Sequence, residues 1–147
     1  MMETQLVGML PDALLIDLPE IDAQHEEIFC RIEALKAACF GSGPAPLEEF
    51  RSLLDYLKHH FASEERIAQQ TGINFAAHAQ VHRENMQVLR KAFSEVLDGS
   101  RDVHSFLRYA EYWFERHINV EDKPFAASVR EVRLNFTTAS PQVAPSF

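Results

Sequence analysis

The side chains best suited to chemistry in this sequence are two pairs of metal-ligand residues, each spaced by four positions. His60 and Glu64 form the first pair, and His78 and His82 form the second. On an α-helix this spacing places both side chains on one face, with Cβ atoms about 5–6 Å apart. Imidazole nitrogens and carboxylate oxygens bind zinc, iron and related metals. We therefore predict that two antiparallel helices bring three imidazoles and one carboxylate to a shared metal site.

The helices that would position these side chains follow from the spacing of apolar residues. A period of three to four residues begins at Pro19 and recurs in four segments that are separated by glycine- or proline-containing turns. Pro124 cannot continue a regular helix, so we expect the fourth segment to end there. The sequence predicts an all-α, up-down-up-down four-helix bundle. The expected helices cover residues 19 to about 40, 46 to 70, 75 to 97 and 103 to 123.

The segments at either end of this bundle show less regular patterns. We expect a single domain, residues 1–147, with an irregular N-terminal arm (1–18), the bundle at about 19–123, and a short C-terminal extension (124–147). Residues 125–134 are expected to add a short helical piece, and the tail from 137 to be loose. Asp17, Asp22 or both are expected to cap the first helix. The arm residues expected to pack against the body are Leu14, Leu15, Ile16 and Leu18.

Every predicted helix carries at least one histidine within its apolar stripe. A single histidine on such a face is usually a hydrogen-bonded core residue. Several together are different, because each buried polar group without a partner costs about 1–3 kcal/mol, and a metal would satisfy all of them. His59 and His104 lie off the stripes and are expected to be solvated or capping. The inward-facing set is His25, His60, His78, His82 and His117, with Glu64.

Five imidazoles exceed the ligands of one tetrahedral zinc, which favours two ions bridged by carboxylates. Glu64 is one candidate bridge. Asp122 is the other, although it stands five residues after His117. In an ideal helix that offset is about 140° away from the stripe, so Asp122 needs a local distortion or a helix end to reach the site.

These residues lie in motifs that resemble the hemerythrins, and specifically the single-domain bacteriohemerythrins. The resemblance covers roughly residues 12 to 126, with family-like order and spacing. One departure is Asp17, because the family often has glycine near this point. The matching motifs are Ile21-Asp22-Ala23-Gln24-His25, His60-Phe61-x-x-Glu64-Glu65, His78-x-x-x-His82 and Trp113-Phe114-x-x-His117-Ile118-x-x-x-Asp122.

The resemblance implies a cofactor of two non-heme iron ions joined by an oxo or hydroxo bridge. One iron would have three imidazole ligands and the other two, leaving a position open for O2, or for azide and similar small anions on the ferric form. Glu64 and Asp122 would bridge both irons. The implied ligands are His78, His82 and His117 on the first iron, and His25 and His60 on the second.

An apolar wall beside the open position would exclude water and protons and so protect a bound gas. Aromatic residues at helical spacing are more often plain core, but a dry wall can serve both purposes. Gln24 and Asp22 are candidates for supporting the ligands or for capping. The candidate wall residues are Ile28, Phe61, Trp113, Phe114 and Ile118.

Composition narrows the class of partner. The formal net charge of −8 and the pI near 5.3 argue against binding to nucleic acid or to an anionic membrane surface. No apolar run approaches the ~20 residues that span a bilayer. The first residues lack a basic segment followed by an apolar core, so we expect a cytoplasmic protein.

The leading interpretation is reversible O2 binding for storage, transport or sensing, by a binding protein and not an enzyme. The alternative is a di-iron enzyme that handles peroxide or nitric oxide, or an iron-donating relative. Ferritin-like di-iron enzymes use Glu-x-x-His pairs, and the sequence contains none. A third possibility is a purely structural zinc bundle, which metal analysis would distinguish.

Overall fold

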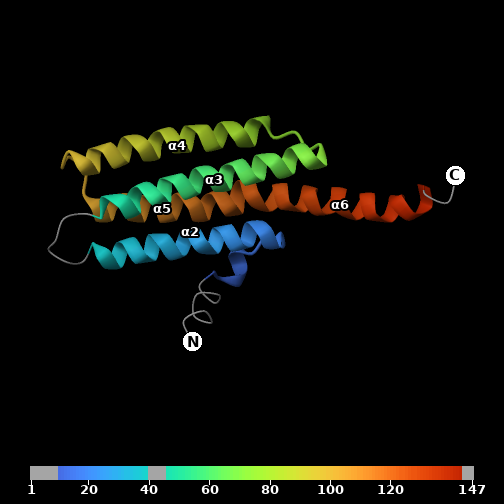
Figure 1. Cartoon of the computed structure of the whole chain (residues 1–147), viewed down its shortest axis with the longest axis horizontal. Helices are drawn as coiled ribbons and strands as arrows, with labels where there is room; N and C mark the ends of the chain where they lie inside the picture. The colour runs from blue at the N-terminus through green and yellow to red at the C-terminus, as the bar shows by residue number, and fades with distance from the viewer. Residues whose placement is uncertain (1–9, 40–45, 144–147) are drawn as a thin grey trace.

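The computed structural model describes residues 10–39 and 46–143. Within these residues there are no strands, and four helices lie side by side in alternating directions (Figure 1). The predicted all-α four-helix bundle is therefore confirmed. None of the described helices is long and apolar enough to cross a membrane. The bundle helices are α2 (Pro19–Ala38), α3 (Leu47–Thr71), α4 (Ala76–Leu97) and α5 (Val103–His117).

Local sequence signals account for the helix ends. Pro19 occupies the first turn of α2, where its missing N–H is not needed. The Asp102 side chain accepts a hydrogen bond from the backbone N–H of Ser105 and caps α5. Gly72 ends α3 in the left-handed conformation, with φ of 74°, which glycine adopts without steric cost. The expected turn at residues 41–44 lies outside the described residues.

The bundle core consists of layers to which each helix contributes one residue. Helices α2 and α4 run opposite to α3 and α5. Along the bundle axis, residue numbers therefore increase on α2 and α4 where they decrease on α3 and α5. One such apolar layer is formed by the buried residues Ile32, Leu53, Leu89 and Ala110.

The fourth helix does not end at Pro124, which corrects the expectation from the sequence. A π-helical turn, η2 (Ile118–Asp122), joins α5 to α6 (Lys123–Val143). Figure 1 shows α6 continuing the line of α5 and projecting past the other helices. The Lys123 N–H bonds to the Ile118 carbonyl, five residues back. Proline has no N–H, and its ring would collide with the carbonyl four residues before it, so a wider turn accommodates Pro124.

The expectation of a short helical piece followed by a loose tail is also wrong as far as Val143, because α6 runs without interruption to that residue. Residues 144–147 lie outside the described part. The first turns of α6 are held by packing, since Phe125, Ala126 and Val129 are buried. Burial of these apolar residues stabilises the start of α6 against the bundle.

The N-terminal arm contains a 3-10 turn, η1 (Asp12–Leu14), and packs against the bundle largely as expected. Leu15 is the exception, because 41% of its surface is exposed. Asp22 does not cap α2: its Oδ1 accepts a hydrogen bond from the backbone N–H of Ile16 at 2.9 Å, and no side chain caps this helix. Asp22 therefore holds the arm to the helix. The described arm residues that are buried are Leu10, Leu14, Ile16 and Leu18.

Two further features fix the arm. Asp17 adopts a left-handed backbone with φ of 61°, the region that favours glycine and tolerates aspartate. The Arg130 side chain of α6 donates a hydrogen bond to the Ile16 carbonyl. The arm is thus tied to both α2 and α6.

Candidate metal centre

All four bundle helices contribute to one polar cluster in the middle of the core. Four histidines, one from each helix, form a layer of the bundle and are buried. One turn away along the bundle axis lie two fully buried carboxylates, Glu64 and Asp122, and a fifth histidine, His78, whose side chain is 11% exposed. The histidines of the layer are His25, His60, His82 and His117.

The π turn brings Asp122 into this cluster. Asp122 follows His117 by five residues, and a regular helix would turn its side chain away from the site. In η2 the turn is wider, so a residue five positions later comes back to the same face. The distortion that the sequence required at this point is present.

The potential ligand atoms converge in two groups that share both carboxylates. Within each group the atoms all lie within 4.8 Å of one another. The three-histidine group consists of His78, His82, His117, Glu64 and Asp122; the two-histidine group consists of His25, His60, Glu64 and Asp122.

Each carboxylate directs one oxygen towards each group. Glu64 Oε1 lies 3.2 Å from His82 Nε2, while Glu64 Oε2 lies 3.5 Å from His60 Nε2. Asp122 Oδ1 lies 3.2 Å from His117 Nε2, while Asp122 Oδ2 lies 3.1 Å from His25 Nε2. Two ions, one in each group, could therefore share both carboxylates.

Bound metal would explain how these atoms are arranged. His25 Nε2, His60 Nε2 and both oxygens of Glu64 are buried without a hydrogen-bond partner. Such unpaired groups are costly in a protein core. Neighbouring ligands at 2.0–2.2 Å from a common ion are ~3 Å apart by simple geometry, close to the separations observed. The residues present therefore fit a pair of metal ions.

Gln24 supports this arrangement by orienting His60. The Ser63 hydroxyl donates to the His59 carbonyl at 3.1 Å and accepts from Gln24 Nε2, also at 3.1 Å. This network directs Gln24 Oε1 to His60 Nδ1, 2.7 Å away. We assign the proton to Nδ1 because the amide oxygen can only accept. His60 Nε2 is then unprotonated and faces the cluster, as a metal ligand requires.

His117 is held in the same way by Glu121, a contact that the sequence interpretation missed. His117 Nδ1 lies 2.7 Å from Glu121 Oε1, so Nδ1 donates and Nε2 faces the cluster. The spacing of four residues on one helix was the available signal. Two consecutive acidic residues thus contact opposite nitrogens of His117: Glu121 contacts Nδ1, and Asp122 contacts Nε2.

The two buried carboxylates differ in protonation. Burial raises the pKa of Glu64 well above its usual range, and the nearby charge of Asp122 raises it further. Burial also opposes ionisation of Asp122, but the neighbouring imidazoles of His117, His25 and His78 outweigh it and hold the Asp122 pKa well below its usual range. Without metal, Asp122 is the anionic centre of the cluster.

The histidines differ in the same manner. Burial alone would lower the pKa of His78, but hydrogen bonds and charges from Asp122 and Glu64 raise it to about 9. Burial and the neighbouring His117 lower the pKa of His82 to about 2. Burial and His25 likewise lower the pKa of His60 well below its usual range. His82 and His60 are therefore neutral, ready to bind a metal.

Aromatic rings surround the cluster. Phe114 makes edge contacts with His25 and His60, at ring-centroid distances of 5.2 and 5.7 Å. Trp113 stacks on His117 at 4.6 Å, on the three-histidine side. Trp113 is half-buried, and the other predicted wall residues, Ile28, Phe61, Phe114 and Ile118, are buried.

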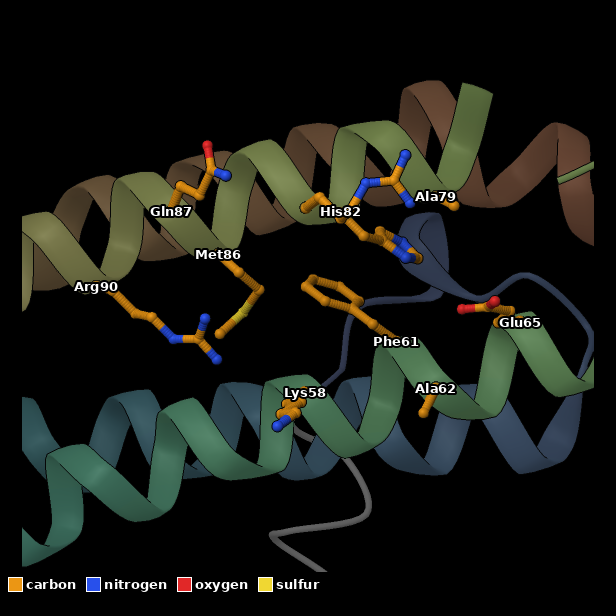
Figure 2. A pocket seen from close by; sticks show the side chains of 10 residues that line it. Lys58, Phe61, Ala62, Glu65, Ala79, His82, Met86, Gln87 and Arg90 are labelled. Carbon is orange, nitrogen blue, oxygen red and sulfur yellow. The ribbon is translucent and has the colours of Figure 1, made fainter. Parts of the chain in front are cut away.

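One histidine of the three-histidine group, His82, lines a groove between α3 and α4. Phe61 stacks on His82 at 3.9 Å, and both line this groove of about 460 Å³. Figure 2 shows Phe61 and Met86 pointing towards each other across the groove, with the His82 ring next to Phe61. Through His82, the three-histidine group therefore reaches the wall of this groove. The other two histidines are not in the cluster, since His59 is exposed and His104 is half-buried.

Comparison with known proteins agrees with this geometry. Residues 17–128 match the family model of the hemerythrin HHE cation binding domain. The chain belongs to the hemerythrin family. The match takes in α2 to α5 and the π turn, and so every residue of both groups. This hemerythrin-family chain is also similar to a bacteriohemerythrin from Stenotrophomonas maltophilia (strain R551-3), with 30% identity over 124 residues, 81% of this chain and 79% of the relative. No solved structure matches it significantly.

Proposed function

We propose that this hemerythrin-family protein holds two non-heme iron ions and uses them to bind O2 reversibly, for storage, transport or sensing. The observation that carries this proposal is the unequal pair of ligand groups. Both groups share Glu64 and Asp122, but one has three histidines and the other has two. With a bridging oxo or hydroxo group in addition, the two-histidine group has one protein ligand fewer and so can accept a small external ligand.

The two ligand groups support an assignment of roles. His78, His82 and His117 would hold the first iron and His25 and His60 the second, with Glu64 and Asp122 as bridges. Bound iron would supply the electrons for reversible O2 binding. Gln24 and Glu121 would fix the orientation of one imidazole on each iron through its Nδ1 atom.

The surroundings of the two-histidine group favour binding over turnover. Phe114 contacts both His25 and His60, and Ile28 is fully buried one turn from His25. A dry apolar wall limits access of water and protons to a bound gas. A role in handling nitric oxide or peroxide is the alternative, because an open position on iron also accepts these molecules.

Metal content and optical spectra test this proposal. We expect two irons per chain, an absorption band that appears when the reduced protein is aerated and disappears under inert gas, and a new band with azide on the ferric protein. Bound zinc without iron would contradict the proposal in favour of a structural metal. An irreversible change on aeration, or catalytic consumption of peroxide or nitric oxide, would support the enzymatic alternative.

A further inference from the structure

One polar residue interrupts the apolar layer next to the histidine cluster. Each helix contributes one residue to this layer. It lies three positions after the cluster histidine on α2 and α4, and three positions before it on α3 and α5. Three of these residues are apolar and fully or almost fully buried. The fourth, on α4 three residues after His82, is Asn85. Its apolar neighbours in the layer are Ile28, Leu57 and Phe114.

Asn85 has no partner for its amide. The residue is only 3% exposed, and neither Oδ1 nor Nδ2 has a hydrogen-bond partner. A buried amide can form several hydrogen bonds, and leaving all of them unmade is destabilising. The amide of Asn85 therefore needs a hydrogen-bond partner other than the side chains around it.

A small cavity lies at this position. Its volume is about 10 Å³, and Asn85 is the polar residue among an otherwise mainly apolar set that lines it. A cavity needs roughly 10–15 Å³ of this kind of volume to hold one water molecule. The lining residues besides the layer of Asn85 are Ile32, Leu53, Leu89, Ala110 and Trp113.

We infer that Asn85 binds a single internal water molecule in this cavity, one layer below the metal centre. The amide would both donate to and accept from that water, which would satisfy Nδ2 and Oδ1 together. Phe114 lines the cavity on one side and contacts His25 and His60. The water therefore lies beside the wall of the two-histidine group.

At this position the water would affect the lifetime of bound O2, an effect that rests on the proposed function. Water near a bound gas favours its loss by proton-dependent reactions, and excluding water slows such loss. Asn85 is thus a positioning residue that limits how long O2 stays bound. Replacing its amide with an apolar side chain dries the layer and lengthens the lifetime of the O2-dependent absorption band.

The primary experiment is a high-resolution crystal structure of the protein and of its Asn85→Leu variant. We expect density for one water within hydrogen-bond distance of both amide atoms in the parent protein and none in the variant. Asn85→Ser is the second variant, which retains a hydrogen-bonding hydroxyl and is expected to keep the water. An empty cavity in the parent protein, or water retained in Asn85→Leu, would overturn the inference.

Two solution measurements complete the test. The metal-free Asn85→Leu variant should melt at a higher temperature than the parent protein, while Asn135→Leu, at an exposed site on α6, should change the melting temperature little. A lower melting temperature for metal-free Asn85→Leu would count against the hydrated amide.

In iron-loaded protein, the lifetime of the O2-dependent band should increase severalfold in Asn85→Leu and stay close to the parent value in Asn85→Ser. An unchanged lifetime in a protein that does bind O2 would overturn the positioning role alone. If no O2-dependent band forms, the proposed function fails, and the crystal structures still decide whether the water is present.

Discussion

Single hydrogen bonds determine which atom each histidine presents to the cluster. Gln24 accepts from His60 Nδ1 and Glu121 accepts from His117 Nδ1. Both contacts leave Nε2 unprotonated and facing inwards. These two residues contribute no ligand atom themselves, yet metal affinity depends on the orientation they impose.

Replacing Gln24 with leucine should weaken the two-histidine group selectively. Without its acceptor, the His60 ring can rotate or change tautomer, and loss of such a contact typically lowers metal affinity ~10–100-fold. Stepwise titration of the metal-free protein with Co²⁺ should show one site weakened and the other unchanged. Gln69→Leu, at an exposed position on α3, is the matched control. Equal weakening of both sites would contradict the separate roles of the groups.

Metal affinity should increase with pH up to about 9. His78 has a pKa of about 9 in the metal-free protein, so at neutral pH it carries a proton that must leave before it can bind a metal. Displacement of one proton raises the apparent affinity about tenfold per pH unit below that pKa. Calorimetry of Zn²⁺ binding in buffers of different ionisation enthalpy would count the protons released. An affinity that is constant between pH 7 and 9 would exclude a protonated His78.

Helix α5, the π turn and α6 form one continuous helical rod. The π turn changes which residues of this rod face the bundle core. The five-residue turn keeps Asp122 in line with His117, and the Lys123 N–H closes it by bonding to Ile118. The same turn precedes Pro124, the residue that a regular helix would not accept at this point. The metal site and the helix extension therefore depend on one local distortion.

The loop between α3 and α4 joins the helices that carry the pairs His60/Glu64 and His78/His82. The backbone conformation of Gly72 in this loop can be tested by substitution. Gly72 has φ of 74°, and a Cβ atom added there would meet nothing within 4 Å. Gly72→Ala should therefore lower the free energy of unfolding by about 1 kcal/mol through backbone strain alone. Gly72→Asn should cost less, because asparagine tolerates this conformation. Urea unfolding of both variants measures the difference, and equal losses would contradict a backbone origin.

In the whole molecule, the metal centre occupies the place that an apolar core would otherwise fill. The cluster draws residues from every bundle helix, and several of its buried atoms lack partners without metal. Stability and metal binding are therefore coupled, since an ion that binds only the folded protein stabilises it.

Removing metal should lower the melting temperature. A free metal concentration 100 times the dissociation constant stabilises the folded state by about 2.7 kcal/mol per site. For a protein of this size that corresponds to about 5–10 °C. Calorimetry of the protein with anaerobic Fe²⁺, and again after chelation, measures this change. Mg²⁺ is the control ion and should have little effect, because it prefers oxygen ligands in a strict octahedron.

The sequence alone was sufficient to predict the helical bundle and the inward-facing residues. Helical periodicity places His25, His60, His82 and His117 on the core faces, because side chains three or four residues apart share a face. Burial of polar side chains without partners is unfavourable, so histidines at core positions indicate a shared ligand. Asp122 required a distortion, and its position in the sequence showed where.

Only the tertiary structure decided what each of these residues contacts. Periodicity identifies a face but not the partner across it, so the contacts of Gln24 with His60 and of Asp22 with Ile16 were not predictable. The continuation of the chain past Pro124 depends on a wider turn and on the packing of Phe125 against its neighbours. Asn85 lies three residues after His82, so periodicity allows it on the inward face of α4. Only the packing of all four helices shows that its amide has no partner.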